Sequence, residues 1–311
     1  MKKTQLDSGK VAVGNTHELY YELHGNPNGK LMVVLHGGPG SCFKQKHTSM
    51  CNLEKYKVLF FDQRGCGLST AKNPLMHNTT QDLVADIKLL IAHVGEKRAI
   101  LCGGSWGSTL ALCFAIAHPQ MVSELRISGI FLATEAETDF SPVLAKFAPD
   151  LYEFIMSEFG SKQSQSKPQS VFTHLTKLTL QGDTRAAYAL QMCECAIMSP
   201  MCNTRTIMRD LQNWNKRPKV IHLPSVQIYA HYLLHNFFLP EAFILHTISK
   251  ISHIKTRIVQ GAQDLLCQPH IAYSLSRELT QCSIKFVRGA HYEAKGDTTS
   301  QLKQALSRLY N

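Results

Sequence analysis

Short apolar runs alternate with stretches of helical hydrophobic spacing over the first part of the chain. The apolar runs fit buried strands, and they cover residues 31–35, 56–61, 98–101 and 125–132. A loosely alternating stretch at 11–23, with the turn signal Gly14-Asn15, predicts a hairpin before them. Between the second and third runs, apolar side chains fall on one helical face, which Gly95 closes: Leu83, Ile87, Leu90, Ile91 and Val94. Strands that alternate with helices predict a mostly parallel sheet covered on both faces.

This alternation stops after Ala133 and resumes only near residue 256. Between them the hydrophobic spacing is mostly helical, so we expect an inserted helical cap. The predicted organisation is an α/β core made of residues 1–134 and 247–311, with the cap formed by residues 135–246.

The last part of the chain returns to the core pattern. Residues 256–260 and 283–287 fit strands, and residues 270–279 between them fit a helix. Asp297 is expected to cap a final helix whose apolar side chains share one face.

Composition places the chain among globular proteins, with 44% hydrophobic and 18% charged residues in 311. Two lysines near the start are not followed by the apolar segment of a signal peptide, and no apolar run approaches the length of a membrane span. The ten cysteines lie mostly in apolar segments, which is typical of free thiols in a reducing compartment. We therefore expect a cytoplasmic protein without a membrane partner.

The formal net charge of +10 raises the question of a nucleic-acid partner. Lys and Arg are spread along the chain without a dense basic run or a nucleic-acid motif, so we expect no such partner. Cys193, Cys195 and Cys202 lie close together but lack the spacing of a zinc site, and no metal is expected.

The most informative motif is Gly103-x-Ser105-x-Gly107, which lies between a predicted strand and a predicted helix. This context defines the nucleophile elbow of the α/β-hydrolase fold, in which a sharp turn lifts a serine hydroxyl above the sheet. Glycines are needed because the two backbones approach closely. The turn also places the Trp106 N–H at a helix N-terminus, where it can stabilise an oxyanion.

Asp264 and His291 each follow a later predicted strand, at the edge of the sheet where Ser105 is expected. The order Ser, Asp, His along the chain is that of the α/β-hydrolases. We predict Ser105 as nucleophile, His291 as general base and acid, and Asp264 as the group that orients the imidazole. The loop His36-Gly37-Gly38-Pro39-Gly40 is expected to supply the second oxyanion donor, with Gly38 preferred over Gly37, and His36 is interpreted as an anchor for that loop.

Several long strings resemble the proline iminopeptidases, which are prolyl aminopeptidases of the α/β-hydrolase fold. The resemblance covers nearly the whole chain and rests on residues 36–40, 61–69, 78–80, 83–87, 103–112 and 129–132, together with the Asp264 and His291 turns. It implies a cofactor-free serine peptidase that removes an N-terminal proline from a small peptide with a free amino terminus. In this interpretation Asp62 and Arg64 brace the loop beside the elbow.

The cap departs from the family pattern. The family holds the substrate amine with two cap glutamates, and Glu194 matches the first of them. Tyr229 stands where the second is usual, so one negative charge would face the ammonium group. We expect Glu194 and Tyr229 to line the substrate site, with weaker selection for a free amine than two acids would give.

Two other functions remain open at this point. The same triad would serve an esterase or amidase acting on small neutral acyl compounds, which a less acidic cap would suit. A non-catalytic binding module is the other alternative, although such proteins usually lose a triad residue. The sequence does not indicate an oligomeric state or a physiological substrate.

Overall fold

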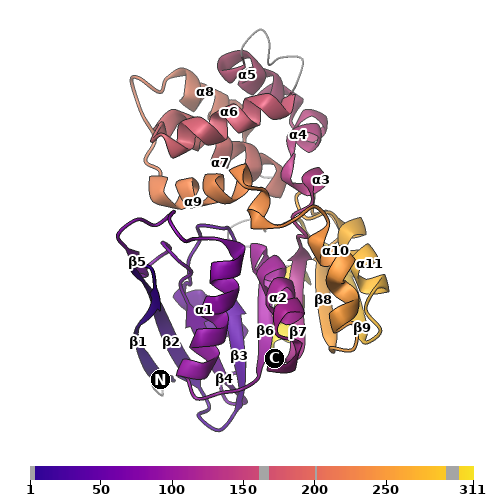
Figure 1. Ribbon diagram of the computed structural model, residues 1–311. Helices are drawn as coiled ribbons and strands as arrows, with labels where there is room; N and C mark the ends of the chain where they lie inside the picture. Colours follow the sequence, from indigo (N-terminus) through magenta and orange to yellow (C-terminus); the bar gives the residue numbers. More distant parts are fainter. Residues whose placement is uncertain (1–3, 161–167, 200–201, 292–300) are drawn as a thin grey trace.

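The computed structural model describes residues 4–160, 168–199, 202–291 and 301–311. Its centre is a sheet whose strands lie in the order β1-β2-β4-β3-β6-β7-β8-β9, with β5 paired to β2 (Figure 1). The strands of the described residues are β1 (Gln5–Gly14), β2 (His17–Gly25), β3 (Lys30–Leu35), β4 (Tyr56–Phe61), β5 (Thr70–Ala71), β6 (Ala99–Ser105), β7 (Val122–Ile130), β8 (Thr256–Gly261) and β9 (Cys282–Val287). All pairings from β4 to β9 are parallel, and those of β2 are antiparallel. The mostly parallel sheet predicted from the sequence is confirmed.

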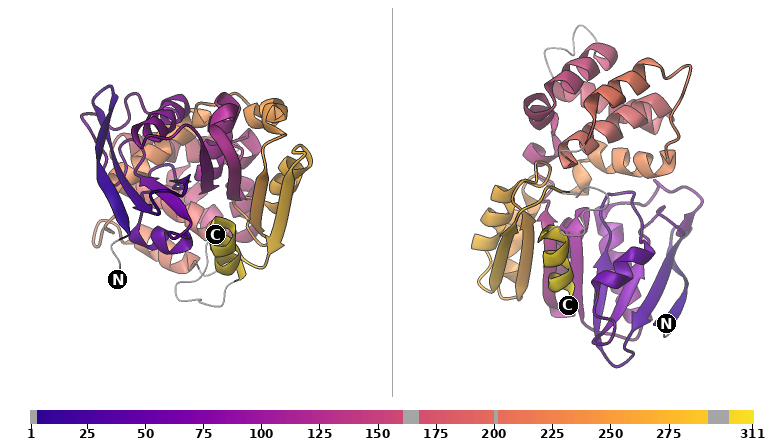
Figure 2. Two further views of the ribbon diagram at one scale, coloured as in Figure 1. Left: turned by 90° about the horizontal axis from the view of Figure 1, so that it is seen from below. Right: turned by 180° about the vertical axis from the view of Figure 1, so that it is seen from behind.

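Helices cover both faces of this sheet because its strands are apolar on both sides. Along β3, Leu31, Val33 and Leu35 join one buried cluster, whereas Met32 joins another on the opposite face. The first face is covered by α1 (Thr80–His93), α2 (Trp106–Ala117), α10 (Phe243–Thr247) and α11 (Pro269–Arg277). The second is covered by the 3₁₀ helix η1 (Gln45–Met50) and by α12 (Gln301–Tyr310), which lies opposite α1 and α2 in Figure 2.

A group of helices lies beyond the carboxyl ends of the parallel strands (Figure 1). Its members are α3 (Glu135–Thr138), α4 (Ser141–Phe147), α5 (Pro149–Phe159), α6 (Pro168–Leu180), α7 (Thr184–Met198), α8 (Thr204–Gln212) and α9 (Leu223–Leu234). Helices α4 to α9 share a buried cluster of their own, which includes Leu151, Leu175, Leu190 and Ile207. No described residue between 135 and 246 joins the sheet. The boundaries proposed for the cap and for the two core segments remain predictions.

Helix α9 holds this group against the core. The Tyr232 hydroxyl donates a hydrogen bond to Asn78 Oδ1 (2.9 Å), and the Ser225 hydroxyl donates to the carbonyl of Gly40. Gly40 has φ +91°, and a Cβ there would lie 2.2 Å from Ser225 O. Only glycine therefore lets α9 rest directly on the loop that follows β3.

The observed elements extend the predicted ones at the point that matters for function. Strand β6 continues to Ser105 and α2 begins at Trp106, so the turn between them contains no additional residue.

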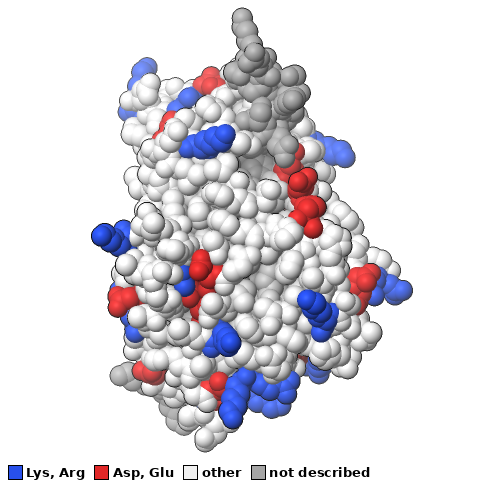
Figure 3. Space-filling model, in the orientation of Figure 1, with Lys and Arg blue, Asp and Glu red and all other residues white. Residues whose placement is uncertain are grey.

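The predicted cap of the last helix, Asp297, lies outside the described residues. Among the helices that are described, none is both long and apolar enough to cross a membrane. Lys and Arg side chains are scattered over the face seen in Figure 3, with acidic side chains between them.

Candidate active site

Ser105 occupies a backbone conformation that few residues other than glycine adopt. Its φ is 56° and its ψ is −131°, at the junction of β6 and α2. Two glycines make the turn possible, because a Cβ at Gly103 would lie 2.2 Å from Gly107 O and one at Gly107 would lie 2.3 Å from Leu35 O. This is the geometry of a nucleophile elbow, with the Ser105 side chain beyond the edge of the sheet.

A buried hydrogen-bond chain supports the elbow from the neighbouring strand ends. The Trp106 indole N–H donates to Gln63 Oε1 (2.9 Å), and Gln63 Nε2 donates to the His36 carbonyl (2.9 Å). The Gln63 backbone N–H donates to His36 Nε2 (3.0 Å), which leaves the ring proton on Nδ1, bonded to Gly37 O (2.9 Å). Burial lowers the pKa of His36 to about 4. The neutral His36 ring therefore joins the loop after β3 to the loop after β4.

Asp62 and Arg64 join the loop after β4 to neighbouring segments. The Asp62 carboxylate accepts the backbone N–H groups of Phe43 (2.7 Å) and Leu68 (2.8 Å). Arg64 makes a two-pronged ion pair with Asp86, with both N–O distances 2.7 Å. Burial raises the pKa of Asp86 to about 6 in spite of this partner. Neither Asp62 nor Arg64 lines the cavities around Ser105.

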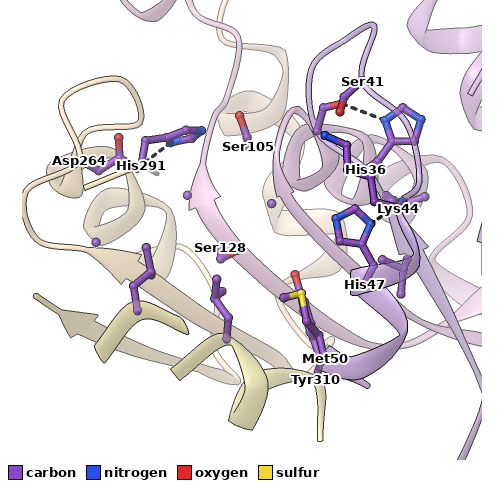
Figure 4. Close-up of a pocket in the computed structure, with 18 of the residues that line it drawn as sticks. His36, Ser41, Lys44, His47, Met50, Ser105, Ser128, Asp264, His291 and Tyr310 are labelled. Carbon is purple, nitrogen blue, oxygen red and sulfur yellow. Dashed lines mark hydrogen bonds and ion pairs between the residues drawn. The ribbon is translucent and has the colours of Figure 1, made fainter. Parts of the chain in front are cut away.

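Asp264 and His291 meet beside Ser105, although they come from loops after β8 and β9 (Figure 4). His291 Nδ1 lies 2.8 Å from Asp264 Oδ2, and both side chains are buried, at 7% and 2% exposure. A Cβ on Gly129 would lie 3.4 Å from His291 Cε1 and 3.6 Å from Ser105 N. His291 and Ser105 therefore both lie next to Gly129. The figure shows the imidazole directed from Asp264 toward Ser105. The three residues thus lie together in the chain order Ser, Asp, His, as a Ser-His-Asp triad requires, and their catalytic roles remain predictions.

The charges around His291 favour its protonated form. Burial lowers its pKa, but the adjoining Asp264 carboxylate and the negative charge of Glu194 outweigh burial, so the pKa is raised overall. Asp264 Oδ1 also accepts the backbone N–H groups of Leu266 (3.1 Å) and Cys267 (2.8 Å), which fixes the carboxylate that orients the ring.

Cys267 is a neighbour of the triad that the sequence reasoning did not assign to the site. Its buried thiol is within hydrogen-bonding range of Ser105, and burial raises its pKa well above the usual range. Asp264, Cys267 and His291 offer possible metal-ligand atoms within 4.8 Å of one another among the described residues. Two of these residues are joined by the Asp264–His291 hydrogen bond, and this pair also suits proton transfer.

The loop after β3 passes close to Ser105, where the second oxyanion donor was predicted. A Cβ at Gly37 would lie 3.6 Å from Ser105 Cβ, and Gly38 lines the cavity on the side of the helical cap. Trp106 is fully buried and begins α2, so its backbone N–H belongs to the helix N-terminus beside the serine. The roles of Trp106, Gly38 and Gly37 remain predictions.

Two cavities meet at the triad, since Ser105 and His291 line both. The larger, about 520 Å³, extends under α7 and α9 and is lined by Glu194 and Tyr229. The smaller, about 250 Å³, extends toward η1 and α12 (Figure 4). Together they give an open space around the serine, in the size range of small-molecule sites.

Glu194 faces the larger cavity and hydrogen-bonds to the Tyr229 hydroxyl. Burial raises the pKa of Glu194 to about 7, although His291 and the Tyr229 hydrogen bond each favour its ionised form. The Tyr229 pKa is raised well above its usual range by burial and by the adjoining carboxylate, so the phenol is the donor in this pair. The cavity wall thus presents one acid whose charge responds to what binds beside it.

Comparison with known proteins places this arrangement in a family. A family model described as the alpha/beta hydrolase fold matches residues 30–292. The chain is 33% identical to a proline iminopeptidase of Xylella fastidiosa, covering 94% of this chain and 92% of that one. It is 34% identical to a proline iminopeptidase of Arabidopsis thaliana, covering 92% of this chain and 75% of that one. This chain belongs to the proline iminopeptidase family.

A solved structure supports the same fold for this member of the proline iminopeptidase family. An α/β hydrolase enzyme from a Medee basin deep-sea metagenome library aligns with a TM-score of 0.64 and 17% identity, covering 97% of this chain and 95% of that one. At that identity the likeness concerns the fold alone.

Gln63 and Lys44 are the other site features that sequence reasoning missed. Gln63 lies within the Asp-Gln-Arg-Gly string, but a string does not reveal that its side chain joins Trp106 to the His36 loop. Lys44 lines both cavities and carried no motif signal at all.

Proposed function

We propose that this protein is a serine aminopeptidase that releases proline from the amino terminus of small peptides through an acyl-enzyme at Ser105. The observation that carries the proposal is a single cavity that holds Ser105 on a strained elbow, His291 oriented by Asp264, and the acid Glu194. The names of the relatives agree with it.

In the first half of the proposed reaction, His291 Nε2 takes the proton of the Ser105 hydroxyl as the oxygen attacks the carbonyl of the first residue. Asp264 holds Nδ1 and stabilises the imidazolium that forms. The backbone N–H of Trp106, with that of Gly38 or Gly37, would stabilise the oxyanion. The imidazolium then gives its proton to the departing amine, and the prolyl group remains on Ser105.

In the second half, water enters the space left by the departing peptide, and His291 takes one of its protons. The oxygen attacks the ester, the tetrahedral intermediate collapses, and Ser105 recovers its proton as free proline leaves. No cofactor is required by these steps.

Selection for a free amino terminus would come from Glu194. An ammonium–carboxylate contact in a closed cavity is charge-assisted, and it is absent from a substrate whose amine is blocked. Glu194 lines the same cavity as Ser105, which supports a contact with the amine of the same residue whose carbonyl is attacked.

One observation favours a second candidate, an esterase or amidase of small neutral acyl compounds. Glu194 is the only acid besides Asp264 among the described residues that line the two cavities, and its pKa of about 7 leaves it partly neutral at physiological pH. A neutral cavity of this kind accepts an uncharged acyl group without loss of binding free energy.

Hydrolysis of proline arylamide compared with a short-chain aryl ester separates the two functions. The aminopeptidase proposal predicts efficient cleavage of the arylamide, which Ser105→Ala abolishes. Turnover of the ester alone would favour the second candidate, and turnover unaffected by Ser105→Ala would contradict both.

A further inference from the structure

One cation borders both cavities around the triad. Lys44 and Ser41 belong to the loop between β3 and η1, and both line the smaller and the larger cavity, as do Ser105 and His291. Lys44 lies close enough to the buried ring of His36 for its charge to lower the pKa of that ring. Figure 4 labels Lys44 and Ser41 among the residues that line the smaller cavity.

The charged groups that line these cavities are of both signs. The acids are Asp264, which is bonded to His291, and Glu194, which lies on the cap side. Lys44 is the only lysine or arginine among the described lining residues, and the remaining basic groups are histidines: His36, His47, His222 and His291. Within the described residues, Lys44 has no ion pair.

A short peptide carries the complementary pair of charges. Its amino terminus is an ammonium, its carboxyl terminus is a carboxylate, and in a dipeptide the two lie about 7 Å apart across one peptide bond. When the ammonium is at Glu194 and the bond is at Ser105, the carboxylate lies on the leaving side. Lys44 lines both cavities, so it borders the path of the leaving residue whichever cavity that residue enters.

We propose that Lys44 binds the C-terminal carboxylate of dipeptide substrates and so makes this enzyme favour dipeptides with proline first over substrates without a carboxylate at that position. This inference rests on the proposed aminopeptidase function and adds the second end of the substrate to it. In longer peptides the carboxylate lies beyond the reach of Lys44, because each added residue extends the chain by about 3.5 Å.

The contact acts on binding and not on the chemical step. The carboxylate is remote from the bond that breaks and keeps its charge throughout, so Lys44 would stabilise the bound substrate and the transition state equally. Removing the Lys44 ammonium should therefore raise KM for the carboxylate substrate and leave kcat nearly unchanged.

The test compares prolyl-alanine with its C-terminal amide, which has the same shape but no terminal charge. We expect the wild-type enzyme to favour the acid by about tenfold in kcat/KM, as a charge-assisted contact in a partly enclosed site can provide. Lys44→Met should bring the acid-to-amide ratio to about one by raising KM for the acid. Lys44→Arg should keep most of the preference.

Lys285→Met is the matched control, because this exposed lysine lies on β9 outside both cavities and its loss changes the net charge equally. An acid-to-amide ratio that Lys44→Met leaves unchanged, or that Lys285→Met lowers equally, would overturn the assignment of Lys44 while the aminopeptidase function stands. A wild-type enzyme that cleaves neither compound but hydrolyses aryl esters would instead overturn the proposed function, and the inference with it.

Discussion

The Tyr229 hydroxyl donates a hydrogen bond to the Glu194 carboxylate in the wall of the cavity that Ser105 also lines. The two residues come from different helices, α7 and α9, so the contact joins these helices at the wall of that cavity. The phenol stabilises the anion but adds no charge of its own. Glu194 therefore supplies all of the negative charge that this pair can offer an ammonium group.

Removing that phenol should weaken selection for a free amine. Tyr229→Phe takes away a hydrogen bond that holds down the pKa of Glu194, so less of the carboxylate is ionised at pH 7. We expect the preference for proline arylamide over its N-acetylated form to fall by about three- to tenfold. Tyr188→Phe is the control, since that hydroxyl bonds to Asp210 (3.1 Å) away from the cavity. Equal effects of the two variants would refute the role of Tyr229.

The triad prediction concerns the chemical step. Ser105→Ala and His291→Ala should each lower kcat by about 10⁴-fold or more, and the double variant should be little worse than either, because the residues act as a unit. A serine-directed covalent inhibitor should label Ser105 in the wild type. Labelling at another residue, or additive losses in the double variant, would argue against the triad.

Glu194 should also give the amine preference a characteristic dependence on pH. Its pKa is raised from 4.5 to about 7, and only the ionised form attracts an ammonium. As the pH falls through about 7, kcat/KM for proline arylamide should decrease relative to the N-acetylated compound. The ratio cancels the titration of His291, which affects both substrates. A ratio that stays constant between pH 8 and pH 5.5 would exclude Glu194 as the amine-binding group.

The buried ion pair of Arg64 and Asp86 should matter for stability without touching the reaction. Arg64→Met leaves a buried carboxylate without its partner, which should cost about 3–5 kcal/mol of unfolding free energy. Adding Asp86→Leu should recover part of that loss. Urea unfolding monitored by fluorescence gives the unfolding free energy of both variants. A value for Arg64→Met within 1 kcal/mol of the wild type would contradict a stabilising role for the ion pair.

His36 should make the folded state sensitive to acid. Its pKa is lowered from 6.5 to about 4, so between these values the unfolded chain binds a proton that the folded chain does not. Stability from this residue is therefore present above pH 6.5 and is lost as the pH falls toward 4. His36→Gln keeps an acceptor for the Gln63 N–H but cannot titrate, so its unfolding free energy should decrease less between pH 7 and pH 5. A decrease equal to that of the wild type would count against this assignment.

The fold could be predicted because its signals are local. The run at 31–35 is apolar on both faces. Glycine is required at 103 and 107 because a Cβ there would lie 2.2 or 2.3 Å from a backbone oxygen. In both cases the residue type in the sequence directly reflects its local surroundings in the fold. The proximity of Ser105, Asp264 and His291 could be predicted because the carboxyl ends of parallel strands meet at one edge of a sheet.

Contacts between distant segments could not be predicted in this way. Nothing in the string that contains Gln63 shows that its amide joins Trp106 to His36, and nothing near Lys44 shows that it borders the cavities. The position of Glu194 in the cavity wall depends on how α7 packs on α9, which helical spacing alone does not determine.

The most direct test of the proposed function compares proline arylamide with N-acetylproline arylamide in the wild type, in Glu194→Gln and in the control Glu153→Gln, which alters an exposed acid of α5. We predict that the wild type and the control cleave the free-amine substrate at least about tenfold better, and that Glu194→Gln loses most of this preference while keeping its activity on the acetylated compound. Equal cleavage of both substrates by the wild type, or an unchanged ratio in Glu194→Gln, would contradict an aminopeptidase anchored by Glu194.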